Sequence, residues 1–138
     1  MKIIVSACLL GENCKYSGGN NRNEKVLEYV KGHEVIPVCP EVMGGLSTPR
    51  SPAEIVRGVV TNRDGVNVDR EFRCGAQHAL EIAMRESVDL AILQSRSPSC
   101  GVHEIYDGTF SGTKIPGKGV FAGLLIQNGF SVLDQEDL

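Results

Sequence analysis

Long apolar runs and strongly basic blocks are both absent from this sequence of 138 residues. No segment approaches the roughly 18 consecutive apolar residues of a membrane-spanning helix, so we expect no membrane partner. Lysine and arginine total 14 against 17 acidic residues and form no block, so a broad nucleic-acid surface is not indicated. Internal repeats and low-complexity tracts are missing as well. The length predicts a single domain, residues 1–138, that buries a core without covalent staples.

The sequence also lacks a Cys-x-x-Cys pair and an apolar segment long enough for a secretory signal. Val5-Ser6-Ala7-Cys8 is similar to a lipoprotein cleavage site, but the apolar stretch before it covers only Ile3–Val5. A signal sequence needs an apolar region of roughly 7–15 residues. There are five cysteines, an odd number. We therefore expect a cytoplasmic location, with thiols used for a metal or for catalysis rather than for disulfides.

Short apolar segments alternate with amphipathic ones along the chain. Strands are predicted at 2–6, 34–38, 90–93 and 130–133, and helices between Asn23 and Gly32, at 69–87 and at 120–128. Pro37 removes a hydrogen-bond donor, which favours an edge position for the second strand. The segments 55–61 and 66–68 flank Asn62-Arg63-Asp64-Gly65, a pattern that predicts a β-hairpin.

This alternation predicts an α/β fold, a single-domain Rossmann-like parallel sheet with helices on both faces and a small β-hairpin insert. By analogy with doubly wound sheets, the first strand should lie between the second and the third. Asp69 is expected to cap the long helix. The apolar side of that helix is predicted to consist of Phe72, Ala76, Ala79, Leu80, Ala83 and Met84.

Three cysteines follow predicted strands. Cys8 comes soon after the first strand, Cys39 directly after the second, and Cys100 after the third, in Ser97-Pro98-Ser99-Cys100-Gly101. The carboxyl ends of parallel strands share one edge of the sheet, so we expect these thiols to converge on the crevice where such folds bind ligands. Cys74 falls on the polar side of the long helix and is expected to take no part. The role of Cys14 is left open: it would be a fourth ligand, a resolving thiol or a packing residue.

Three or four thiolates at one place suit a zinc ion or an iron–sulfur cluster. A set of three leaves one coordination position open, which is typical of catalytic metals. Thiol redox chemistry and buried structural cysteines are the alternatives that the residues leave open.

Other polar groups are predicted at the same edge of the sheet. Glu41 follows Cys39 by two residues and would serve either as a carboxylate beside the metal or as a cap for the loop amides. Ser97 and Ser99 come just before Cys100, although serines in such turns usually bond their own backbone. Arg50 and Arg96 would bring positive charge, unless Arg50 pairs with Glu54. The turn-rich segment 106–112 is expected to cover the site.

Several separated motifs together resemble a known family. They are Ser6-Ala7-Cys8-Leu9-Leu10-Gly11 with Cys14-Lys15-Tyr16, Cys39-Pro40-Glu41-Val42-Met43-Gly44-Gly45-Leu46 with Pro49-Arg50-Ser51-Pro52-Ala53-Glu54, and Ser97-Pro98-Ser99-Cys100-Gly101. In this order, and spread over essentially the whole chain, they resemble the short thiouracil desulfurase family, long catalogued as a domain of unknown function.

The resemblance implies a [4Fe–4S] cluster held by Cys8, Cys39 and Cys100, with the fourth iron free. It also implies removal of sulfur from 2-thiouracil-like bases without net redox change. Glu41 and Ser97 match the catalytic carboxylate and hydroxyl proposed for the family.

The partner expected from this resemblance is a small-molecule thiolated base or nucleoside, and tRNA is possible but not indicated by the charge. One alternative is a non-catalytic zinc- or cluster-binding module in tRNA sulfur metabolism. Another is a thiol-redox protein that uses Cys8 and Cys14.

Overall fold

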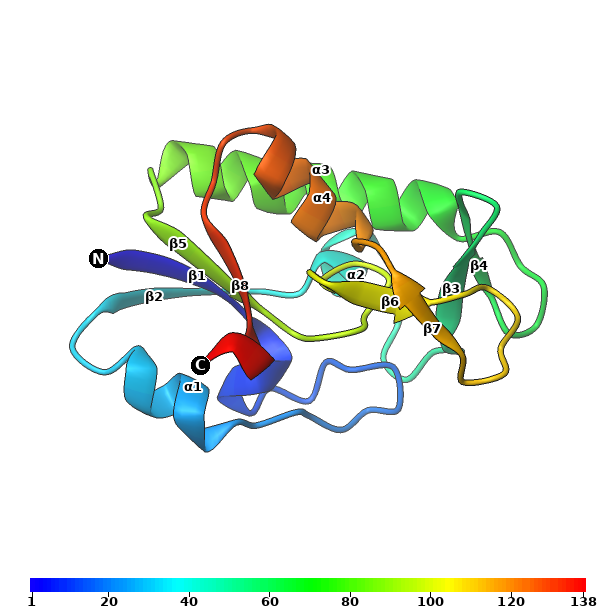
Figure 1. Cartoon of the computed structure of the whole chain (residues 1–138), viewed down its shortest axis with the longest axis horizontal. Helices are drawn as coiled ribbons and strands as arrows, with labels where there is room; N and C mark the ends of the chain where they lie inside the picture. Colours follow the sequence, from blue (N-terminus) through cyan, green and yellow to red (C-terminus); the bar gives the residue numbers. More distant parts are fainter.

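Four parallel strands form the centre of the computed structural model, which describes residues 1–138 (Figure 1). They are β1 (Lys2–Ser6), β2 (Glu34–Val38), β5 (Leu90–Leu93) and β8 (Val132–Asp134), in the order β2-β1-β5-β8. The first strand thus lies between the second and the third, as predicted. Pro37 lies opposite Val5 on the edge strand β2, where a missing N–H leaves no gap in the interior of the sheet.

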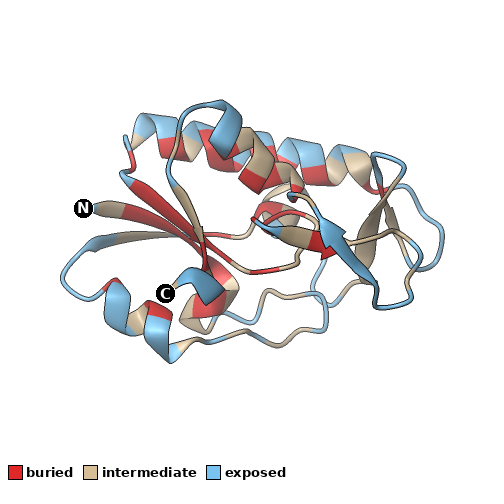
Figure 2. Cartoon of the chain, in the orientation of Figure 1, coloured by how far each residue is buried: buried red, intermediate tan, exposed pale blue.

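Helices cover both faces of this sheet, which confirms the predicted fold class. The helices α3 (Asp69–Arg85) and α4 (Val120–Gln127) enclose the larger core cluster, which includes Ile4, Leu93 and Phe121. On the other face, α1 (Glu24–Tyr29) and the 3₁₀ turn Ala7–Leu10 enclose a smaller cluster. The central strands and the inward sides of the helices carry most of the buried residues (Figure 2). None of the helices combines the length and hydropathy that crossing a membrane requires.

The helix termini agree in part with the sequence prediction. The side chain of Asn23 caps α1 by accepting the N–H of Val26 at 3.1 Å, as expected. Asp69 lies inside the first turn of α3 and does not cap it, because its carboxylate accepts the N–H of Val60 at 3.0 Å instead. Met84 is 49% exposed, so its assignment to the buried side of α3 was wrong. It lies more than a quarter turn from the centre of the buried stripe.

Two antiparallel hairpins lie beyond the carboxyl ends of the parallel strands (Figure 1). The first, β3 (Ala53–Val56) and β4 (Val59–Asn62), turns at Arg57-Gly58, where φ is 51° and 80°. The predicted turn at 62–65 is present as well, because Thr61 pairs antiparallel with Asn67 and the N–H of Asn62 donates to the carbonyl oxygen of Val66. The turn at Arg57-Gly58 was not predicted, and it divides the strand expected at 55–61. Two residues with positive φ suit a tight hairpin, whereas Asn62 folds a separate turn by accepting the N–H groups of Asp64 and Val66. The second hairpin, β6 (Glu104–Tyr106) and β7 (Lys114–Pro116), was not predicted.

The short helix α2 (Pro40–Met43), also not predicted, packs directly on α3. Two glycines make this approach possible. A Cβ on Gly75 would lie 1.7 Å from the carbonyl oxygen of Pro40, and a Cβ on Gly44 would lie 1.8 Å from that of Glu71. Because α2 begins directly after Cys39 and contains Glu41, this backbone contact fixes the position of both residues.

Candidate functional site

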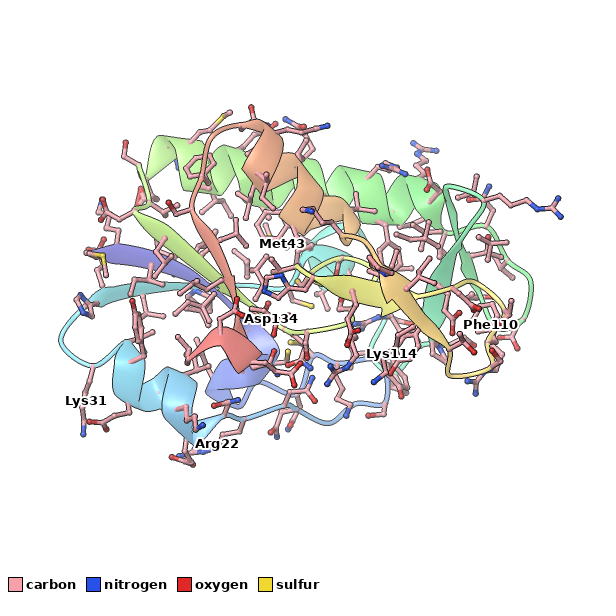
Figure 3. All side chains as sticks on the ribbon, viewed as in Figure 1. Arg22, Lys31, Met43, Phe110, Lys114 and Asp134 are labelled. Atoms are coloured by element: carbon pink, nitrogen blue, oxygen red, sulfur yellow. The ribbon has the colours of Figure 1, made fainter.

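A cavity of about 470 Å³ opens at the carboxyl ends of β1, β2 and β5, beneath the two hairpins. Four of the five cysteines line it: Cys8, Cys14, Cys39 and Cys100. Cys74 is exposed on α3, away from the cavity, as predicted. In Figure 3, Asp134 marks the end of β8 near the middle of the molecule, and Phe110, which also lines the cavity, marks the loop of the second hairpin. The predicted convergence of three cysteines on this edge of the sheet is thus found.

Cys8 lies in the 3₁₀ turn that follows β1. Its carbonyl oxygen accepts the N–H groups of Gly11, at 3.2 Å, and Asn21, at 3.0 Å, which holds the turn closed. Gly11 has a φ of 100°, a left-handed conformation that favours glycine. The side-chain amide of Asn21 donates to the Sγ of Cys8 at 3.5 Å. Burial raises the pKa of the Cys8 thiol, so this sulfur would be held as a thiolate by a cation rather than by water.

Cys39 occupies the cap position of α2, and its Sγ lies 3.8 Å from the carbonyl oxygen of Cys14. The thiol of Cys14 hydrogen-bonds to Cys39 and lowers the pKa of Cys39 to about 7. The same hydrogen bond, together with burial, raises the pKa of Cys14. Cys14 therefore contacts Cys39 through both its thiol and its carbonyl oxygen.

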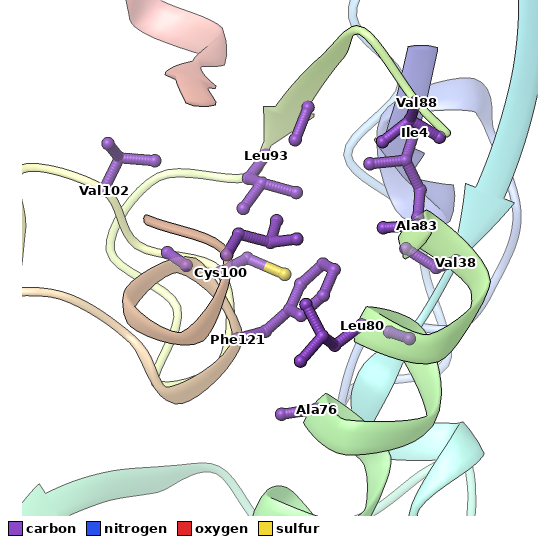
Figure 4. Close-up of a cluster of buried hydrophobic side chains, with 14 residues drawn as sticks. Ile4, Val38, Ala76, Leu80, Ala83, Val88, Leu93, Cys100, Val102 and Phe121 are labelled. Carbon is purple, nitrogen blue, oxygen red and sulfur yellow. The ribbon is translucent and has the colours of Figure 1, made fainter. Parts of the chain in front are cut away.

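Cys100 sits in a loop whose backbone is held from both sides. The Oγ of Ser97 accepts the N–H groups of Ser99 and Cys100, each at 3.1 Å. The first N–H groups of α4, which lack partners within the helix, donate to this loop, and that of Phe121 reaches the carbonyl oxygen of Ser99 at 2.8 Å. Cys100 shares a buried cluster with Phe121 (Figure 4), and burial raises its pKa to about 12.

The donor set suits a cluster better than a single ion. No three His, Cys, Asp or Glu side chains come together as a site for one metal ion. The thiols instead surround a cavity, and in an iron–sulfur cluster each thiolate binds a different iron, so the ligands stay farther apart than around one ion. The residues present therefore fit a [4Fe–4S] group, and the geometry does not favour zinc.

Glu41 projects from α2 into the wall of the cavity, and both of its oxygens are engaged. Oε1 accepts from the Nε of Arg50 at 3.0 Å, and Oε2 accepts from the Oγ of Ser99 at 2.8 Å. The side chains of Arg50 and Glu41 are only 8% and 16% exposed. The predicted alternative of an Arg50–Glu54 pair was wrong, because Glu54 instead accepts the N–H groups of Gly108 and Phe110.

The two serines of the loop have different partners. Ser97 bonds the loop amides and the Oγ of Ser99 (2.9 Å). Ser99 is 2% exposed and contacts both Glu41 and the Sγ of Cys100, the latter at 3.6 Å. The sequence prediction that Ser97 is the hydroxyl of the site omitted this direct contact of Ser99. The Ser-x-Ser spacing could have indicated Ser99. Once one serine of the pair bonds the loop amides, as Ser97 does, the other is free to face the site.

The roof of the cavity is held by hydrogen bonds to Glu54, and one wall by the ion pairs of Arg96. Glu54 ties the first hairpin to the loop 107–112 of the second through Gly108 and Phe110, at 2.9 and 3.1 Å. Tyr106, Phe110 and Gly112 line the cavity, which confirms that this segment covers the site. Arg96 also lines it, but its guanidinium is paired with Glu104 and Glu136.

Comparisons with known proteins agree with this site. A family model described as 2-thiouracil desulfurase matches residues 3–137. The chain is 40% identical to the "uncharacterized protein YbbK" of Bacillus subtilis (strain 168), with 99% of this chain and 97% of that protein covered. A solved structure described as a [4Fe-4S]-dependent thiouracil desulfidase, TudS, superposes with a TM-score of 0.93 at 39% identity, over 99% of this chain and 92% of that one. The chain therefore belongs to the 2-thiouracil desulfurase family.

Proposed function

We propose that this chain is a [4Fe–4S]-dependent desulfurase that replaces the sulfur of a 2-thiouracil-like pyrimidine by oxygen. The observation that carries the proposal is its similarity, over 99% of the chain, to a solved [4Fe-4S]-dependent thiouracil desulfidase. Cys8, Cys39 and Cys100 would hold the cluster, because they line one cavity at the ends of three strands. When bound, the cluster would supply a soft Lewis acid for the sulfur of the substrate.

The overall reaction exchanges one atom without moving electrons. Water supplies the oxygen that binds the ring carbon, the carbon–sulfur bond breaks, and the protons of water leave with the sulfide. Glu41 is the group placed to take a proton from that water, since its carboxylate lies in the wall of the cavity that the thiols also line.

The two serines of the loop orient their hydroxyl groups toward this carboxylate. Because the Oγ of Ser99 donates to Glu41, the hydroxyl of Ser97 is free to donate to Ser99. In the chain Ser97–Ser99–Glu41 both hydroxyl protons therefore point toward the carboxylate, which stabilises its ionised form and holds it in place. Ser99, which touches Glu41 directly, takes the role predicted for the hydroxyl of the site, and Ser97 supports it.

Replacing Ser99 by alanine is expected to lower kcat about 30-fold, within the range of a lost hydrogen bond to a charged group. Ser97→Ala is expected to have a smaller effect, about 5-fold, because Ser97 reaches Glu41 only through Ser99. Steady-state kinetics on protein with matched iron content measures both. A larger loss for Ser97→Ala than for Ser99→Ala would contradict this order.

The substrate is proposed to be a free thiolated base or nucleoside. The sequence has no block of lysine or arginine and a formal net charge of −3, so a tRNA substrate has no electrostatic support. The free cysteines around the cavity fit a reducing cytoplasm.

The test is turnover. Protein reconstituted anaerobically with iron and sulfide is given 2-thiouracil, and the loss of the ultraviolet band of the substrate is compared with the sulfide released. Equal amounts of base converted and sulfide formed are expected. An iron-loaded protein that converts nothing would favour the non-catalytic binding module instead.

A further inference from the structure

Arg50 donates four hydrogen bonds from a nearly buried side chain, and two of them reach separate residues of the cavity wall, Glu41 and Cys14. Nε binds the Oε1 of Glu41 at 3.0 Å, and Nη2 binds the carbonyl oxygen of Cys14 at 2.8 Å. Nη1 binds the carbonyl oxygen of Ser47 at 3.2 Å and the Oγ1 of Thr48 at 3.0 Å. Four of the five N–H groups of the guanidinium are thus engaged within the protein.

The backbone of Arg50 adds a fifth contact. Its N–H donates to the carbonyl oxygen of Tyr16 at 2.8 Å. Together with the bond to Cys14, which lies 36 residues before Arg50 in the sequence, this contact fixes the segment 14–16. The carbonyl of Cys14 lies 3.8 Å from the Sγ of Cys39. Arg50 therefore connects the carboxylate of Glu41 to the segment that contacts Cys39.

We propose that Arg50 is a positioning residue for sulfur removal, whose planar fork fixes the orientation of the Glu41 carboxylate relative to the segment 14–16. The proposal rests on the proposed role of Glu41. Ser99 holds Oε2 and Arg50 holds Oε1, so neither partner alone stops the carboxylate from rotating. A lysine has a single nitrogen and cannot bond Glu41 and the Cys14 carbonyl in the geometry of the fork, although it keeps the charge.

The first test replaces Arg50 by lysine in the reconstituted holoenzyme. We expect kcat to fall about 100-fold, the effect of misplacing a catalytic group by about 1 Å. The KM for 2-thiouracil and the iron content should stay within about 2-fold of the wild type, because Arg50→Lys leaves the cysteines in place. Arg73 provides a matched control. Its Nε binds Asp69 and its Nη2 binds the carbonyl of Gly58, the same pattern outside the site, so Arg73→Lys should leave kcat unchanged.

A double-mutant cycle separates action through Glu41 from a general effect on the fold. If Arg50 works by orienting Glu41, then Arg50→Lys should lower kcat by less than about 3-fold when Glu41 is already glutamine. A full 100-fold loss in that background would overturn the proposal. So would an Arg50→Lys variant with wild-type kcat, or one whose iron content falls in step with its activity. Because the role of Glu41 is tested separately by Glu41→Gln alone, a failure of that role is distinguished from a failure of this proposal.

Chemical rescue gives an independent readout. Arg50→Ala removes the fork. Guanidinium at millimolar concentration should raise the kcat of this variant at least 10-fold by binding where the side chain was. Methylammonium, a point charge without a fork, should restore none. Equal rescue by both cations would show that charge alone is needed and would overturn the role of the fork, as would the absence of any rescue by guanidinium.

Discussion

Protein in which Cys100 is replaced by alanine is expected to bind almost no cluster and to lose all measurable turnover. The physical reason is the burial of this thiol, which is 4% exposed in a loop held by Ser97 and by the start of α4. No other thiol can move into the position of its sulfur without breaking those contacts. Iron and sulfide analysis with an anaerobic visible spectrum measures the cluster directly.

Cys74→Ala is the matched control for this experiment. Cys74 is exposed on α3 and contacts no part of the cavity, so its removal should leave iron content and kcat at wild-type values. Cys8→Ala and Cys39→Ala should behave like Cys100→Ala. A Cys100→Ala protein that retains a full cluster would remove Cys100 from the ligand set, and the place of Cys14 beside Cys39 would then make it the next candidate.

The second large effect is expected at Glu41. Glutamine has the same shape and keeps an oxygen for Ser99 or Arg50, but it cannot accept the proton of the attacking water. We expect kcat to fall about 10³-fold, within the range for a lost general base, while the iron content stays at the wild-type value. Single-turnover kinetics with 2-thiouracil on iron-matched protein gives the chemical step.

Glu54→Gln serves as the comparison for Glu41→Gln. Glu54 also lines the cavity but binds two backbone N–H groups of the roof. The Glu54→Gln substitution should therefore lower kcat much less than Glu41→Gln does. A Glu41→Gln variant as active as the wild type would show that water is activated without this carboxylate. The proposed roles of Ser99 and Arg50 would then fail with it.

Several features of the molecule follow from local patterns in the sequence. The apolar segments around Ile4 and Ile92 specified the two central strands, and Pro37 placed β2 at the edge. The alternation of strands and helices then required a parallel sheet, and a parallel sheet brings its carboxyl ends to one edge. For this reason the convergence of Cys8, Cys39 and Cys100 could be predicted without coordinates.

Other features depended on contacts between distant segments. The turn at Arg57-Gly58 was missed because it lies within the apolar segment 55–61, which locally suits one strand, and only the pairing of Val60 with Ile55 divides that segment. The capping role expected of Asp69 was lost to the N–H of Val60. In both cases local preference was overridden by tertiary packing.

The sequence by itself determined which residues would reach the site, since a residue at the end of a parallel strand has only one edge of the sheet to occupy. The partners of those residues were decided only by the tertiary structure. Arg50 bonds Glu41 rather than Glu54, and Ser99 rather than Ser97 contacts Glu41. The reason is that hydrogen bonds are fixed by atomic positions within a few tenths of an ångström, and these depend on contacts such as that of Gly75 with Pro40, which no local pattern encodes.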